Sequence, residues 1–313
     1  LISHISYLIS LAFLYIYVLS TPGGIYWDVV TNYRLAHFNI DINKFEKLLR
    51  LISESDQKKI TIPKLLPNEM INIIGNESVD IFPYQVGRVL ASGLYWKNRP
   101  VYQSYITSSE WLIQQNVNFF NDHEKSPEYI IFHYPYSLDH RYLLNDELQT
   151  FLRIRDLYES ILLKDNFLLL KKRGNKSRSA NWETKLKQIS KPNATIIFEN
   201  EIIQKSSIGN NICVGSLDIR KSLYGILKKI LYKEEPIFIT YYLDDSSRTF
   251  RYIPDLGKSG ILLYPFLESS GDLYDFFSKK ERVFPVVTGI SIDFRTNESF
   301  YEENYKIEIK CTN

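Results

Sequence analysis

The residues best suited to chemistry are polar side chains next to predicted strands. Asp80 belongs to one strand-like run, and Asp139 and Arg141 follow another. Open α/β sheets bind ligands at the carboxyl ends of their parallel strands. We therefore expect a polar crevice at this edge that recognises a sugar, a lipid-linked sugar or a periplasmic polymer. The candidate ligand-binding residues are Asp80, Arg99, Gln103, Tyr105, Asp139 and Arg141.

The same residues have a second interpretation, an internal network that fixes loops. Arginine and carboxylate side chains often form bidentate ion pairs inside proteins. In this alternative, Arg99 or Arg141 pairs with Asp80 or Asp139 and no ligand is involved.

We assign no catalytic residue to this chain. Asp80 and Asp139 would need a defined separation to act as paired carboxylates, and the sequence does not set one. Ser137 with His133 and His140 suggests a hydrolase, but a Gly-x-Ser-x-Gly nucleophile elbow is missing.

No metal or cofactor is expected either. The five histidines are scattered and lack metal-ligand spacing. The sequence contains neither a Walker loop nor a Gly-x-Gly-x-x-Gly motif, which argues against nucleotide binding.

Alternating strands and helices are predicted to position the candidate residues. The continuous apolar runs 129–132 and 167–170 are typical of buried strands, and 79–82, which contains Asp80, is predicted to be a short strand. Helical spacing between them, including 145–163, predicts a small parallel sheet covered by helices. We expect a Rossmann-like α/β domain over residues 74–173.

The second half is rich in strand-like segments and predicts an antiparallel β-sandwich-like domain over residues 194–313. Asp244–Ser247 is predicted to be a hairpin loop. The basic stretch 174–193 is expected to be a solvated linker. Cys213 and Cys311 lie in strand-like segments, either as a disulfide or as buried free thiols.

The chain begins with about 20 uncharged, mostly apolar residues, enough to cross a bilayer. We interpret residues 1–22 as a transmembrane helix, the last span of a longer protein, followed by a helical connector over 23–73. A buried core helix and a signal-peptide remnant are the alternatives. The formal net charge of +2 implies no nucleic-acid partner.

Several segments together resemble one family of large bacterial polytopic membrane proteins, some of which are similar to integral-membrane glycosyltransferases. Members end in a soluble extracytoplasmic domain, whose expected Asp-Gly-Arg block has His140 in place of glycine here. The resemblance implies a location at the inner membrane with the soluble part outside the cytoplasm. The matching residues are Val79–Pro83, Leu94–Tyr105, Leu112 with Asn116, Pro127–Phe132, Leu138–Arg141, Asn145–Asp146, Phe250–Pro254 and Ser259–Pro265.

Three functions follow as hypotheses. In the first, this chain is a non-catalytic extracytoplasmic part that binds or positions a glycan or lipid-linked sugar for an upstream transmembrane domain. In the second, it belongs to a membrane glycosyltransferase whose catalytic acid lies upstream of Leu1. In the third, it is an assembly module of an envelope complex. The membrane is an expected partner in all three.

Overall fold

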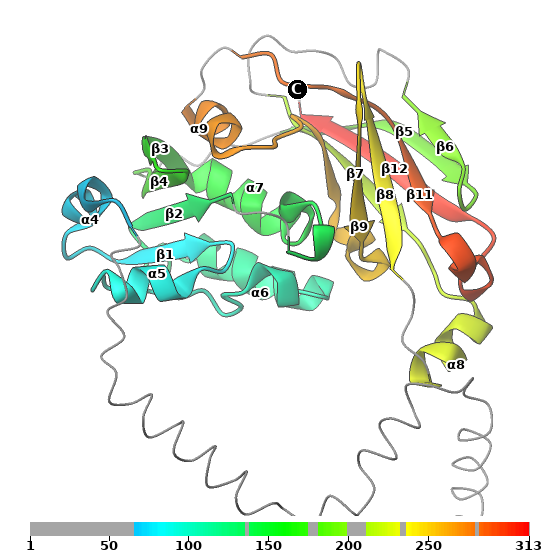
Figure 1. Ribbon diagram of the computed structural model, residues 1–313, viewed down its shortest axis with the longest axis horizontal. Coiled ribbons are helices and arrows are strands. Elements are labelled where there is room, and N and C mark those ends of the chain that lie inside the picture. The colour runs from blue at the N-terminus through cyan, green and yellow to red at the C-terminus, as the bar shows by residue number, and fades with distance from the viewer. Residues whose placement is uncertain are drawn as a thin grey trace, which may run out of the picture. The chain divides into compact units, whose positions relative to one another are not determined.

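Three four-stranded sheets organise the residues that the structure, a computed structural model, describes (Figure 1). These residues belong to one compact unit, 63–313. The described ranges are 66–134, 138–174, 181–198, 211–231, 236–278 and 282–312.

The first sheet is mixed, with the order β1-β2-β4-β3. Strands β1 and β2 are parallel, with Val79 opposite Tyr129, whereas β4 runs antiparallel to both β2 and β3. The strands are β1 (Val79–Phe82), β2 (Tyr129–His133), β3 (Tyr158–Lys164) and β4 (Phe167–Lys172).

Helices cover both faces of this sheet, which explains why its central strands are continuous apolar runs. Successive strand residues face opposite sides, so Ile81 packs in one apolar cluster and Phe82 in the other. Helices α4 and α5 contribute to the first cluster, and α6, α7 and α9 to the second. Their bounds are α4 (Asn68–Ile74), α5 (Val86–Ala91), α6 (Glu110–Asn121), α7 (Leu148–Leu157) and α9 (Ser270–Ser278).

The predicted parallel, Rossmann-like sheet is wrong, because a hairpin replaces the last crossover. Helix α7 ends at Leu157, and residues 158–163 of the predicted helix 145–163 belong to strand β3 instead. Asp165 and Asn166 have φ values of 49° and 64°, the left-handed conformation of tight hairpin turns. The turn reverses the chain, so β4 pairs antiparallel with β3.

The predicted fold class also included an N-terminal transmembrane helix, and this part of it is corrected too. Residues 1–22 and most of the predicted connector lie outside the described residues; helix α4 forms part of the connector's end. Among the described residues, no helix is long and apolar enough to span a bilayer. The fold class is therefore one mixed α/β sheet with two antiparallel sheets.

The second half forms two antiparallel sheets that share one apolar core, as in a sandwich. Side chains of β8 alternate between buried and half-buried, the pattern of a strand with one face on the core. One sheet has the order β10-β7-β12-β5 and the other β6-β11-β8-β9. The bounds are β5 (Trp182–Ser190), β6 (Thr195–Ile197), β7 (Cys213–Asp218), β8 (Ile237–Leu243), β9 (Ser247–Tyr252), β10 (Ile261–Tyr264), β11 (Val287–Asp293) and β12 (Tyr305–Thr312).

Two features of this half were not assigned from the sequence. Strand β5 lies within the stretch expected to be a linker and pairs along β12. Cys213 and Cys311 lie opposite each other on β7 and β12 and form a disulfide, which joins positions 98 residues apart.

The mixed sheet and the sandwich are joined by a buried polar and aromatic contact. The Tyr142 ring stacks on Phe266, and its hydroxyl donates to the carbonyl oxygen of Leu267. The amide of Asn145 donates to the Tyr241 hydroxyl at 2.6 Å and accepts from the backbone N–H of Leu262. These contacts fix the loop after β2 against the sandwich.

Candidate functional site

Arg99 lies at the centre of a closed, buried cluster. Its Nη1 atom donates to Asp80 Oδ2 at 2.7 Å and to the carbonyl oxygen of Ile81 at 2.9 Å. Its Nη2 atom donates to the Tyr102 carbonyl oxygen and to Ser104 Oγ. Both Arg99 and Asp80 are about fully buried, with exposed fractions of 0% and 1%.

Two further buried residues extend this cluster. Glu147 Oε1 lies 3.9 Å from Arg99 Nε, and Glu147 Oε2 accepts a hydrogen bond from the Asn116 amide at 2.7 Å. Burial raises the pKa of Glu147, while the positive charge of Arg99 acts in the opposite direction. Asn116 also bonds the backbone N–H and carbonyl oxygen of Val101. The cluster holds the 99–104 loop against β1, the geometry of the internal-network interpretation.

An open cleft of about 630 Å³ lies near the carboxyl ends of β1 and β2. We call it the Arg141 pocket. In this mixed sheet, β4 begins where β2 ends, with Phe167 opposite His133. The turn before β4 therefore reaches the same edge. The lining residues are Gln85, Arg88, His133, Tyr134, Arg141, Leu143, Asn166, Phe250, Glu268, Ser269 and Ser270.

Three residues of the Arg141 pocket have buried polar atoms without a hydrogen-bond partner in the part of the chain that the structure describes. The atoms are Gln85 Oε1, His133 Nδ1 and Arg141 Nε. Buried polar atoms are nearly always satisfied, so such groups beside a cleft call for an explanation. A polar ligand in the pocket would provide one.

His133 is a neutral imidazole at pH 7. Burial, with a smaller contribution from the positive charge of Arg88, lowers the pKa of His133 to about 4. The ring stacks on Phe167 with centroids 4.4 Å apart. Because the unfolded chain protonates this residue near pH 6.5, His133 lowers stability as the pH falls from about 6.5 to about 4.

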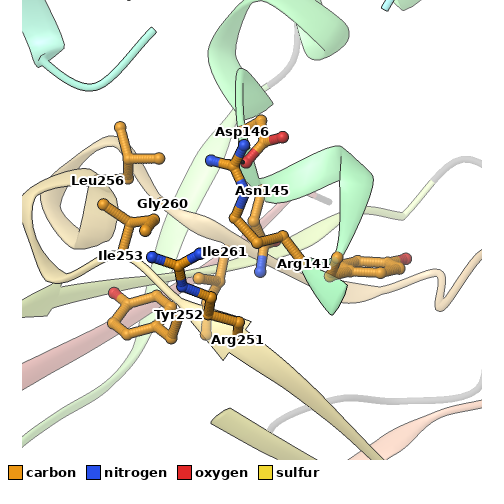
Figure 2. A pocket seen from close by; sticks show the side chains of 10 residues that line it. Arg141, Asn145, Asp146, Arg251, Tyr252, Ile253, Leu256, Gly260 and Ile261 are labelled. Carbon is orange, nitrogen blue, oxygen red and sulfur yellow. Dashed lines mark ion pairs between the residues drawn. The ribbon is translucent and has the colours of Figure 1, made fainter. Parts of the chain in front are cut away.

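Arg141 is buried, and an ion pair and a hydrogen bond to residues outside the pocket lining fix its side chain. Its Nη1 lies 3.1 Å from Asp146 Oδ1, and its Nη2 donates to the Tyr105 carbonyl oxygen at 3.2 Å. Figure 2 draws a smaller pocket that Arg141 also lines, and it shows Asp146 beside this guanidinium, with Arg251 extending from the neighbouring strand. Burial raises the pKa of Asp146 to about 7, although Arg141 lowers it. These bonds set the position of Arg141 at the pocket.

The loop that carries Arg141 has an unusual backbone. Asp139 and His140 both have positive φ, 53° and 57°, a region that glycine adopts most readily. Asp139 is exposed and its carboxylate accepts from Arg251 Nη1 at 2.9 Å. A glycine at position 140, as in the resembled pattern, would adopt this conformation without steric cost.

An aromatic surface continues from the Arg141 pocket and shares Gln85 and Arg88 with it. The rings of Trp96 and Tyr102 meet edge to face there, with centroids 5.7 Å apart. Gln103 is half-buried and lines the same surface. We call this aromatic surface, lined by Gln85, Arg88, Trp96, Tyr102 and Gln103, the Trp96 surface.

The structure does not bring the six predicted site residues together in one place. Asp80 and Arg99 are enclosed in the buried cluster. Arg141 lines the pocket, and Gln103 lines the Trp96 surface. Tyr105 packs its ring on Tyr84 near them, whereas Asp139 forms a surface ion pair.

Sequence reasoning missed Gln85, Arg88, Phe250 and Ser269 as pocket residues. Gln85 and Arg88 follow β1 directly, so their place after a buried strand was an available signal. Phe250 and Ser269 come from the second half, more than 100 residues away in sequence, and only the tertiary fold brings them to the pocket.

In comparisons with known proteins, no protein-family model, no curated protein and no solved structure matches this chain. The family resemblance stays a prediction, and the candidate site rests on its own geometry.

Proposed function

We propose that this chain binds a glycan with an acidic group in the Arg141 pocket and holds it without transforming it. One observation carries the proposal: Gln85, His133 and Arg141 have unpartnered buried polar atoms at the same cleft. The cleft volume of about 630 Å³ is within the range of small-ligand sites.

The mixture of donors and acceptors supports a sugar. A sugar hydroxyl both donates and accepts hydrogen bonds, and neutral His133, Gln85 and Asn166 offer both kinds of partner. Phe250 lines the same cleft and offers an apolar ring to the C–H face of a sugar. The Trp96 surface provides room for a further sugar unit next to the pocket.

The charges at the pocket support an acidic ligand. Arg88 and Arg141 both line it, and arginine suits carboxylate and phosphate groups. The acidic residue on the lining is Glu268, whose carboxylate already pairs with Arg248 at 2.6 Å.

A site of action outside the cytoplasm belongs to the same proposal. The Cys213–Cys311 disulfide supports it, since structural disulfides persist in oxidising compartments and are rare in the cytosol. Glycans with carboxylate or phosphate groups fit both the proposed location outside the cytoplasm and the charges of the pocket.

Replacing Arg88 with glutamine tests the proposal by isothermal titration calorimetry. Trigalacturonate is the carboxylate probe and mannose 1-phosphate the phosphate probe; the methyl ester of the first and free mannose are the uncharged references. We expect an acidic probe to bind, and Arg88→Gln to raise its Kd about tenfold to a hundredfold, the value of a charged hydrogen bond.

Arg153→Gln is the matched control, since Arg153 is a half-buried helical arginine on a different groove. It should leave the Kd unchanged, and thermal unfolding should show both variants folded. Equal affinity for acidic and uncharged probes, or an unchanged Kd in Arg88→Gln, contradicts the proposal.

Affinity should also depend on the protonation of His133. An anion bound near His133 raises the pKa of its imidazole above the value of about 4 in the free protein. Binding then takes up a proton, and the Kd should fall as the pH is lowered from 7 to 5. Calorimetry with trigalacturonate at both pH values should show a steeper trend in the wild type than in His133→Gln, because the Asp146 carboxyl beside Arg141, whose pKa is about 7, still titrates in both proteins. The same profile in both proteins would refute it.

A further inference from the structure

Helix α8 (Leu223–Leu231) presents a row of apolar side chains to solvent. We propose that this helix docks on the surface of a lipid bilayer that contains anionic lipids. Monomeric proteins rarely expose such contiguous apolar patches without an interaction partner. The exposed fractions are 83% for Leu223, 57% for Tyr224, 50% for Ile226 and 63% for Leu227.

Helix α8 contacts the rest of the protein closely at Gly225, its smallest residue. Gly225 is buried, and a Cβ atom built on it would lie 1.9 Å from the carbonyl oxygen of Phe300, so only glycine fits. Ser222 accepts from the Gly225 N–H at 3.0 Å and donates to the Ser299 carbonyl oxygen at 2.8 Å. Lys228 Nζ lies 3.8 Å from the centroid of the Phe300 ring.

These contacts fix which face of α8 is outward. Gly225 and Lys228 are three residues apart and share the face toward η6 (Arg295–Phe300). Leu223 and Leu227 are four apart and fall on the opposite side. The leucines therefore contribute little to the fold and are available to a partner. Figure 1 shows α8 beyond one end of the sandwich strands.

The sequence around the helix selects an anionic bilayer over a second copy of the chain. Residues 218–235 carry a net positive charge, since the acidic residues Asp218, Glu234 and Glu235 are outnumbered by Arg220, Lys221, Lys228, Lys229 and Lys233. Asp218 pairs with Arg220. Two copies would bring like charges together, which opposes association. A basic, amphipathic helix with exposed leucines has the composition of interfacial membrane helices.

A fluorescent probe on α8 tests this inference in the full chain. Tyr224→Cys is labelled with nitrobenzoxadiazole under non-reducing conditions and mixed with vesicles of phosphatidylcholine, with or without 30% phosphatidylglycerol. We expect a rise in emission with anionic vesicles, quenched by lipids that carry a nitroxide near the headgroup. Trp111→Cys, an exposed site on α6, is the matched label control and should not respond.

A second variant identifies the side chains responsible. Leu223→Asp with Leu227→Asp, in the labelled chain, should weaken vesicle binding at least tenfold, while the circular dichroism spectrum stays unchanged. Three outcomes would overturn the inference: no response of the α8 label to anionic vesicles, unchanged binding in the double variant, or sedimentation that shows a dimer lost in that variant. Because the pocket does not enter this assay, failure here leaves the proposed function untouched.

Discussion

Replacing Arg99 with methionine should lower the free energy of unfolding by about 3–5 kcal/mol, the usual cost of leaving a buried charge unpaired. The variant keeps the apolar stem but removes the guanidinium that bonds Asp80 and lies beside Glu147. Asp80 would retain a hydrogen bond from the Trp96 indole at 3.0 Å. Urea unfolding followed by circular dichroism measures the loss.

A second substitution separates the charge from the packing. Asp80→Asn in the Arg99→Met background removes one of the stranded carboxylates and should recover part of the lost stability. Arg153→Met is the control for loss of a half-buried arginine and should cost less than about 1 kcal/mol. If Arg99→Met lowers the free energy of unfolding no more than the Arg153→Met control does, the cluster does not anchor the 99–104 loop.

Removal of the Cys213–Cys311 disulfide is expected to have an effect of similar size. The bond closes a span of 98 residues, and the loss of its chain-entropy term costs about 4–5 kcal/mol. Thermal unfolding of Cys213→Ala with Cys311→Ala should therefore occur well below the wild-type temperature. Measured with and without a reductant, the wild type should lose stability on reduction.

The double alanine variant also serves as the control for the reductant. Its unfolding temperature should be the same in both buffers, since the sequence has two cysteines and this variant lacks both. A wild type that is insensitive to reductant, with two free thiols by mass spectrometry, would contradict the disulfide and weaken the argument for an extracytoplasmic site.

Elements with a strong local signal could be predicted from the sequence. Ser109 is the N-cap of α6, and its side chain accepts from the Leu112 N–H, as its position before an apolar helical run predicts. The loop between Leu243 and Ser247 joins the antiparallel strands β8 and β9, as its two aspartates predict. The continuous apolar runs at β2 and β4 are strands with both faces covered.

Strand direction in the first sheet could not be predicted in this way. Residues 158–164 have apolar positions compatible with a helix, and the Asp165–Asn166 turn that reverses the chain has no glycine. Tertiary pairing with β4 decided the outcome. The same limit explains β5, whose basic, exposed residues are typical of a solvated linker but pair along β12.

For the candidate site, residue types were more predictable than their settings. Arg99 and Arg141 each pair with a carboxylate, yet one is enclosed and the other lines a cleft. That difference depends on the contacts of Tyr142 and Asn145 with the sandwich, which bring Phe250 and Glu268 to the same pocket as Arg141. Contacts over 100 residues apart are not readable from one sequence.

The most direct test of the account is whether an acidic glycan reaches the Arg141 pocket. Nitrogen-15 spectra of histidine-labelled protein, assigned with His133→Gln, report on the imidazoles during titration with trigalacturonate or mannose 1-phosphate. The account predicts that the His133 resonances shift with the acidic probe, while those of exposed His123 on the loop after α6 do not. Binding by calorimetry without a His133 shift, or a shift confined to other histidines, would place the ligand elsewhere and contradict the account.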